Sequence, residues 1–299
     1  MMNTTTSRWE TLNFLLTNRV PRALLTRIMG RISNIESPML TKLGIGLWQR
    51  FDKLDFAEAE ADSFSSLQQC FTRKLKPGAR PVDARQDVLV SPCDAIIGAH
   101  GAVENGNLFQ IKDAPYRLAD LIPQGVLQDR FKNGRYVTLR LKSSMYHRFH
   151  APCDCRVQEI AYISGDTWNV NPPALRRVAN LFCKNERAVL CLETGFENES
   201  LVMVPVAAIL VASMQLHALD QTLDLKYDGP NYLRCDASYN KGDEMGFFKQ
   251  GSTIILFTTE NFEFSEKVIL GNQISMGQPL LTRVIEHGKE VSNGRKPEL

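Results

Sequence analysis

The chain lacks a hydrophobic run long enough to cross a membrane, which takes about 17–25 apolar residues. Its longest apolar stretch extends from Leu201 to Met214 and is interrupted by Pro205. The apolar cluster nearest the N-terminus, Leu12 to Leu16, is too short for a secretory signal peptide. We therefore expect neither a transmembrane helix nor a cleaved leader.

A strong excess of one charge is also missing, because the net charge is only +2 over 299 residues. This balance indicates no particular class of partner, and we expect no nucleic acid to bind. With 43% hydrophobic and 23% charged residues, the composition is that of an ordinary globular protein. The length fits one large domain or two small ones.

The cysteines do not suggest a disulfide framework, because seven is an odd number in a chain of this length. Free thiols in a reducing compartment are expected instead. Cys153 and Cys155 lie near His147 and His150, which resembles a set of zinc ligands. The one-residue cysteine spacing is not that of usual zinc motifs, and no second cysteine pair stands at a suitable distance. We therefore expect no metal site.

Positive charge gathers in the first 53 residues, which carry eight basic and three acidic side chains. Apolar residues recur there at helical spacing over residues 9–55, and Pro21 and Pro38 divide the segment into three predicted short helices. Basic amphipathic helices suit an anionic membrane surface. They suit equally well a helical cap packed on the core, so the segment alone leaves both interpretations open.

A Gly-Ser step, Gly251-Ser252, opens an apolar, β-branched run that is typical of a buried strand. Glycines at 242, 246 and 251 let the backbone turn tightly before that strand. Because glycine has no Cβ, the Gly251 carbonyl is open to a close nucleophile, and the nearest one is the Ser252 hydroxyl. The alternative interpretation is an ordinary turn that enters a strand.

Two further segments carry candidate acid–base residues. The alternating strand pattern of residues 136–142 leads into Tyr146-His-Arg-Phe-His150, in which two of the five histidines stand three residues apart. Asp94 follows a Ser-Pro step. By themselves these residues also fit a polar strand end and a turn cap, respectively.

Segment 241–253, KGDEMGFFKQGST, resembles the processing segment of phosphatidylserine decarboxylases, which usually reads K-G-x-E-x-G-x-F-x-x-G-S-T. The resemblance extends over nearly the whole sequence. Its other motifs are FTRKLKPGARP at 71–81, SPCDA at 91–95, YHRFHAP at 146–152, NLFCKNER at 180–187 and MGQPL at 276–280.

The resemblance implies that the chain cuts itself between Gly251 and Ser252, giving a β chain of residues 1–251 and an α chain of residues 252–299. Ser252 would become an N-terminal pyruvoyl group, so no separate cofactor is expected. Asp94, His150 and Ser252 would form the triad for cleavage, in which an imidazole oriented by a carboxylate takes the hydroxyl proton.

The same resemblance implies roles in decarboxylation. The pyruvoyl group acts as an electron sink, as pyridoxal phosphate does elsewhere. His147 would be the general acid that protonates the substrate α-carbon, and Tyr146, Arg148 and Thr253 would contact the substrate.

We accordingly expect an α+β fold, with a largely antiparallel β core and N-terminal amphipathic helices that face the membrane. Residues 1–60 would form the membrane-association region and residues 61–299 the decarboxylase core. The resemblance further implies phosphatidylserine as substrate, a heterodimer of the α and β chains that pairs into a homodimer, and a peripheral location at the cytoplasmic face of a bacterial cell membrane.

The sequence departs from the family pattern at several positions. Ala95, Ala207 and Ala212 stand where glycine is usual, and residues 142–145, KSSM, replace the usual S-P-x-D. The alternatives are a pyruvoyl decarboxylase of another amino-acid headgroup or of a soluble amino acid, a Ser-His-Asp hydrolase that keeps its serine, and a lipid-binding protein without activity.

Overall fold

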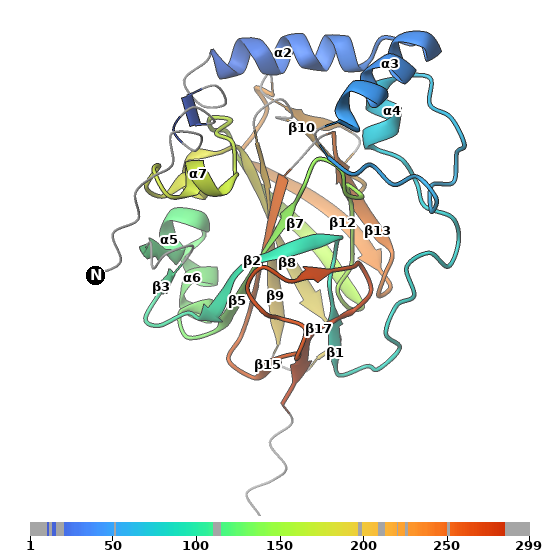
Figure 1. Ribbon diagram of the computed structural model, residues 1–299. Helices are drawn as coiled ribbons and strands as arrows, with labels where there is room; N and C mark the ends of the chain where they lie inside the picture. Colours follow the sequence, from blue (N-terminus) through green and yellow to red (C-terminus); the bar gives the residue numbers. More distant parts are fainter. Residues whose placement is uncertain are drawn as a thin grey trace, which may run out of the picture.

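The computed structural model describes residues 11, 14–15, 21–50, 52–109, 115–196, 199–208, 213–219, 221–224, 227–249 and 252–284. A large antiparallel β core carries short helices on one side, and two longer helices lie across one end of it (Figure 1). This arrangement confirms the predicted α+β class. Gly251 and Ala212 fall outside the described residues.

The core is built on an eight-stranded sheet with strand order β12-β7-β8-β9-β14-β5-β2-β16, in which every pairing is antiparallel. Its strands are β2 (Ala95–Ala102), β5 (Arg135–Leu141), β7 (Cys155–Ile163), β8 (Arg187–Thr194), β9 (Ser200–Ala207), β12 (Tyr232–Tyr239), β14 (Ser252–Thr258) and β16 (Gln273–Ile274). The strand predicted after the Gly-Ser step is therefore β14, a central strand.

Three smaller sheets complete the β structure. One has strand order β11-β10-β13-β6 and consists of β6 (Arg148–His150), β10 (Ser213–Leu216), β11 (Thr222–Asp224) and β13 (Glu244–Phe248). Another has strand order β1-β17-β15 and consists of β1 (Val88–Val90), β15 (Phe262–Phe264) and β17 (Pro279–Arg283). The third is the pair β3 (Asn107–Phe109) and β4 (Pro115–Arg117).

Both faces of β14 are buried, which explains why its sequence is a continuous apolar run rather than an alternating one. Ile254 and Leu256 belong to the core cluster that also contains residues of the β11-β10-β13-β6 sheet and of the β1-β17-β15 sheet. Ile255 and Phe257 belong to the cluster on the opposite face. That face is covered by four short helices, α5 (Leu118–Leu121), α6 (Gly125–Phe131), α7 (Pro172–Leu175) and α8 (Leu181–Lys184).

The helices across the end of the core are α2 (Arg22–Ser33) and α3 (Pro38–Trp48), with α4 (Leu67–Phe71) close to α3 (Figure 1). Pro21 is the N-cap of α2 and Pro38 is the first residue of α3, so both prolines mark helix starts as predicted. The first predicted helix lies largely outside the described residues. Within the described part of the chain, no helix is both long and apolar enough to span a bilayer.

Candidate active site

Ser252 is the first residue of β14 and pairs with Leu141 on β5 and Ala207 on β9. Its side chain is fully buried, and its Oγ has no hydrogen-bond partner among the described residues. Most buried hydroxyl groups are hydrogen-bonded, so a buried Ser252 hydroxyl without a described partner needs a physical reason. A nucleophile that must approach the carbonyl of the preceding residue provides one.

Backbone hydrogen bonds bring together the three segments that carry the predicted catalytic residues. The Phe248 amide, four residues before Ser252, donates to the His147 carbonyl oxygen over 3.0 Å. The His150 amide donates to the Pro92 carbonyl oxygen over 2.8 Å, two residues before Asp94. Residues far apart in the sequence therefore converge at one end of β14.

Two of the glycines ahead of Ser252 have identifiable structural roles. A Cβ at Gly246 on β13 would collide with the Gln215 carbonyl oxygen of neighbouring β10 and with the ring of Phe149. Gly242 has a φ of +89°, a conformation that side chains disfavour, and its carbonyl oxygen accepts a hydrogen bond from His150. Both glycines thus fix the strand that leads to the candidate site.

His150 is held by two hydrogen bonds. Its Nδ1 lies 2.8 Å from the Gly242 carbonyl oxygen, which can only accept, so Nδ1 carries the proton. Its Nε2 lies 3.0 Å from the Tyr146 hydroxyl and accepts from it. Burial lowers the pKa of His150 and raises that of Tyr146. His150 is therefore a neutral imidazole whose basic nitrogen is aimed at a phenol.

His147 is completely buried, and its ring lies close to backbone polar groups of Met145 and Phe71, although neither ring nitrogen makes a well-formed hydrogen bond to the described residues. Its ring lies edge-on to Phe71 of α4, with 6.1 Å between the ring centroids. Burial, reinforced by the positive charge of Arg73, lowers the pKa of His147 to about 3. It is therefore neutral at physiological pH, and it carries the proton that a general acid must deliver only if an anion bound nearby raises its pKa.

Asp94 is buried and is bound mainly by Arg80. The guanidinium donates from Nε to Oδ1 over 2.8 Å and from Nη2 to Oδ2 over 2.6 Å, and the Met276 amide donates to Oδ1 over 2.9 Å. None of the described hydrogen bonds links Asp94 to His150, or His150 to Ser252. The three residues share one neighbourhood without forming a hydrogen-bonded triad, so their catalytic roles remain predictions.

Sequence reasoning missed Arg80, the partner of Asp94, which also pairs with Glu58 at 2.8 Å. The two partners are 14 residues apart in segments without regular periodicity. The only signal was the position of Arg80 next to a proline in the 71–81 segment, which resembles a family motif.

The residues expected to contact the substrate differ in their surroundings. Arg148 donates to Glu244 over 2.6 Å and to the Thr72 carbonyl oxygen over 2.6 Å, and its guanidinium lies 5.0 Å from the Phe247 ring centroid. These contacts attach β6 to β13 and to the end of α4. Thr253 is fully buried with an unpartnered hydroxyl, one residue beyond Ser252. Substrate contact by Arg148, Thr253 or Tyr146 stays a prediction.

The alanines that replace family glycines do not strain the backbone where the structure describes them. Among the described residues other than glycine, only Asn105 and Asn180 have a positive φ. Ala95 and Ala207 therefore occupy conformations that any residue adopts, and alanine there reduces the entropy of the unfolded chain.

Comparison with known proteins agrees with the resemblance seen in the motifs. The family model for phosphatidylserine decarboxylase matches residues 67–282. A protein from Shewanella baltica named phosphatidylserine decarboxylase proenzyme is 34% identical over 275 residues, covering 87% of this chain and 92% of its own. Proteins of the same name from Vibrio cholerae and Psychromonas ingrahamii are 32% and 33% identical and cover 87% and 90% of this chain, and 94% and 96% of their own.

The matched region runs from α4 to β17 and includes every candidate residue described above. The orphaned Ser252 and the two buried histidines all lie within it. The chain therefore belongs to the phosphatidylserine decarboxylase family.

Proposed function

We propose that the chain cuts itself between Gly251 and Ser252, and that Ser252 then becomes the pyruvoyl group with which the enzyme converts phosphatidylserine to phosphatidylethanolamine and carbon dioxide. The observation that carries this proposal is the buried Ser252 hydroxyl, which starts a central strand and has no hydrogen-bond partner among the described residues. The relatives named as proenzymes support a cleaved product.

In the cleavage step, the Ser252 oxygen attacks the Gly251 carbonyl, and the acyl group moves from the serine nitrogen to that oxygen. Elimination from Ser252 breaks the new ester and releases the Gly251 carboxylate, and hydrolysis then expels ammonia and leaves a ketone. The proton of the serine hydroxyl needs a base. His150 is neutral and supplies it, with the Tyr146 hydroxyl bonded to its Nε2 available to relay the proton.

In the decarboxylation step, the pyruvoyl group supplies an electron sink for the bond that breaks as carbon dioxide leaves. The chain supplies the proton that replaces the carboxylate on the substrate α-carbon. His147 is our candidate donor, because its ring is enclosed and neither nitrogen makes a well-formed hydrogen bond to the described residues. Its burial also keeps water away from the reacting carbon.

The intact mass of the purified wild-type protein tests this proposal. We expect two pieces, residues 1–251 and a 48-residue piece that is one ammonia lighter than its serine-headed form. Reductive trapping with short-chain phosphatidylserine should add the lipid to the smaller piece, and a panel of other amines should trap less well. A single chain whose serine reacts with a fluorophosphonate probe would instead identify a hydrolase.

The surface proposed to meet the lipid bilayer lies on α2 and α3. Large apolar side chains on these helices and the segment that joins them are exposed, and they are Leu24, Ile28, Ile32, Ile35, Met39, Leu40, Leu43 and Leu47. Met39 is 82% exposed and Leu43 is 70% exposed. Such a concentration of exposed apolar surface is typical of an interaction site. These exposed side chains support the membrane interpretation over a helical cap packed on the core.

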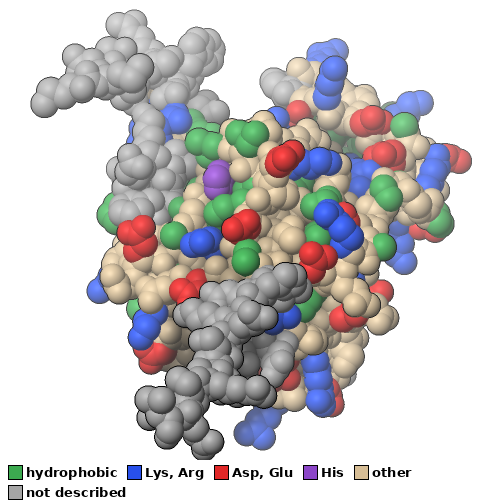
Figure 2. Space-filling view, turned by 90° about the horizontal axis from the view of Figure 1, so that it is seen from below, with side chains coloured by type: hydrophobic (Ala, Val, Ile, Leu, Met, Phe, Trp, Pro, Cys, Tyr) green, Lys and Arg blue, Asp and Glu red, His purple; other side chains and the backbone are tan. Residues whose placement is uncertain are grey.

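The surface at the opposite end of the molecule has a different mixture of charged and apolar side chains. Seen from that end, acidic and basic side chains are intermingled with scattered apolar ones (Figure 2). We therefore assign membrane contact to the helical end, and we expect apolar insertion to contribute more to it than charge does.

Replacing Leu43 and Leu47 together by serine should weaken binding to vesicles of anionic lipid about 10–100-fold, because two inserting side chains are lost. Vesicle co-sedimentation measures this. Replacing Ile269 and Leu270, which are 54% and 65% exposed but lie outside the helices, should have no effect. High salt should weaken binding without abolishing it. Binding that disappears in salt and is unchanged in the serine variant would contradict the assignment.

A further inference from the structure

The segment after α4 carries four basic residues, and three of them have an evident place. Arg80 pairs with Asp94 and Glu58. Lys76 donates from Nζ to the Ala57 carbonyl oxygen over 2.9 Å, and Lys74 is exposed to solvent. The remaining basic residue of this segment, Arg73, has only 7% of its surface exposed to solvent. It is therefore a cation that the fold has taken out of water.

Arg73 forms no direct ion pair with a described residue, and the carboxylates of Asp94 and Asp55 act on its charge only from a distance. Its Nη1 donates to the Cys70 carbonyl oxygen over 3.2 Å and its Nη2 to the Ser144 carbonyl oxygen over 3.0 Å, while its buried Nε has no partner. A guanidinium has five N–H donors, so most of its hydrogen-bonding capacity is unused. The nearby Asp94 is already occupied by Arg80.

A buried charge without a partner is strongly unfavourable, and proteins compensate such charges with an opposite one. Burial accordingly lowers the pKa of Arg73, although arginine remains charged. The missing anion can be a ligand. The planar guanidinium is well suited to bind the oxygens of a phosphate or carboxylate group.

Arg73 adjoins the candidate active site. The Ser144 carbonyl that it binds lies three residues before His147, and Phe71, two residues before Arg73, contacts the His147 ring. The charge of Arg73 also acts on His147 and lowers its pKa. An anion bound at Arg73 would therefore lie close to the imidazole.

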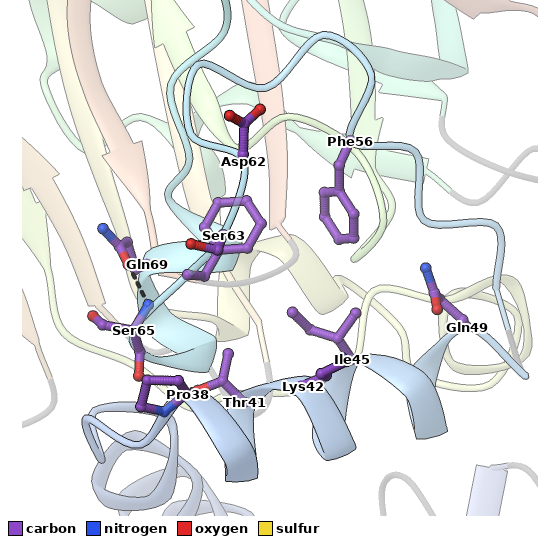
Figure 3. A pocket seen from close by; sticks show the side chains of 11 residues that line it. Pro38, Thr41, Lys42, Ile45, Gln49, Phe56, Asp62, Ser63, Ser65 and Gln69 are labelled. Atoms are coloured by element: carbon purple, nitrogen blue, oxygen red, sulfur yellow. Dashed lines mark hydrogen bonds between the residues drawn. The ribbon is translucent and has the colours of Figure 1, made fainter.

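On its other side, Arg73 contacts a side chain that lines a pocket. Its guanidinium carbon lies 5.4 Å from the ring centroid of Phe56, and Phe56 lines a cavity of about 670 Å³ between α3 and the loop of residues 56–65 (Figure 3). Thr41 and Ile45 of α3 line the same cavity, whereas Leu43 and Leu47 on the same helix are exposed to solvent. The pocket is thus lined by the helix that carries part of the proposed membrane surface, and Phe56 connects it to Arg73.

We propose that Arg73 binds the headgroup phosphate of the phospholipid substrate. This inference rests on the proposed function, and it adds a specificity-determining residue to it. The phosphate is the better match than the carboxylate, because the carboxylate loses its charge as carbon dioxide leaves. An arginine paired with the carboxylate would stabilise the substrate more than the transition state and slow the reaction. The phosphate keeps its charge throughout, so its binding affects affinity rather than the chemical step.

The test compares Arg73→Gln with Lys74→Gln, a matched control that removes the exposed charge next to it. Four soluble amines are trapped reductively on each cleaved protein: short-chain phosphatidylserine, short-chain phosphatidylethanolamine, serine and ethanolamine. Arg73→Gln should weaken trapping of both phospholipids about 10–100-fold and leave serine and ethanolamine unchanged. For phosphatidylserine turnover, KM should rise by that factor with little change in kcat. Lys74→Gln should match the wild type.

The contrary outcomes are distinct. If only phosphatidylserine loses affinity, Arg73 binds the carboxylate and the proposal is wrong. If all four amines are trapped as in the wild type, Arg73 binds no part of the substrate. If the wild type traps no amine, the proposed function itself fails. Should Arg73→Gln not fold or cleave, Arg73→Lys keeps the charge but loses the planar donor pair, and it should still raise KM for the phospholipid. An unchanged KM in Arg73→Lys would then overturn the proposal.

Discussion

Replacing Ser252 by alanine is expected to leave a single uncut chain of 299 residues with no detectable decarboxylase activity. Alanine removes the only atom that can attack the Gly251 carbonyl and also removes the source of the ketone. The loss should therefore be complete rather than partial, and intact mass spectrometry together with a carbon dioxide release assay measures it. Because Ser252 Oγ makes no hydrogen bond to the described residues, the substitution should not reduce stability.

Ser200→Ala is the matched control, since Ser200 also begins a buried strand of the same sheet. That variant should cut and turn over as the wild type does. A Ser252→Ala protein that still separates at position 251 would show that an outside protease makes the cut, and the self-cleavage proposal would be abandoned.

Replacing each of the two histidines by alanine is expected to block a different step, cleavage for His150 and substrate turnover for His147. His150→Ala should accumulate uncut precursor, because the neutral imidazole that accepts the serine proton is gone. The reduced pKa of His150 keeps this base unprotonated at neutral pH, so wild-type cleavage should slow less as the pH falls from 8 toward 6.5 than it would with a histidine of ordinary pKa. Timed gel analysis of freshly synthesised chain measures both effects. Tyr146→Phe, which keeps the ring and removes the hydroxyl bonded to Nε2, should slow cleavage less than His150→Ala does.

His147→Ala should still cut but should turn substrate over about 10²–10⁴-fold more slowly, which is the usual effect of losing a positioned acid. Reductive trapping of substrate on the cleaved protein should remain efficient, because binding precedes the proton transfer. His217→Ala provides a control, since His217 is a partly exposed histidine that pairs with Glu244. Normal cleavage in His150→Ala combined with blocked cleavage in His147→Ala would reverse the two roles.

The central strand of the core could be expected from the sequence pattern, whereas the convergence of the candidate residues was implied only by the family resemblance. Residues 254–257 are apolar at every position and mostly β-branched or aromatic, a pattern typical of a strand buried on both faces. Pro21 and Pro38 marked the starts of two helices because proline lacks the amide that an interior helical turn requires. Each of these signals depends only on residues that are neighbours in the sequence, so each can be recognised without knowing the tertiary structure.

Side-chain partnerships between distant segments could not be predicted in the same way. Arg80 occupies Asp94, and Tyr146 and Gly242 occupy His150, so the hydrogen bonds expected within the triad are absent from the described residues. Nothing in the spacing of the basic residues distinguishes buried Arg73 from exposed Lys74. Burial depends on how α4 packs against the rest of the fold, which is a tertiary property.

The central position of β14 determines how the two pieces of a cut chain would be held together. Residues 252–284 provide β14, which pairs with β5 on one side and β9 on the other, and also β15, β16 and β17 in two sheets. A cut before Ser252 would therefore leave two pieces whose strands pair with each other within the same sheets, without any covalent link between the pieces. Once unfolded, the two pieces must find each other by diffusion, so recovery depends on their concentration. The uncut chain needs no such encounter, so the proposed cleavage would turn a chain that can refold by itself into two pieces that, in dilute solution, assemble efficiently only once.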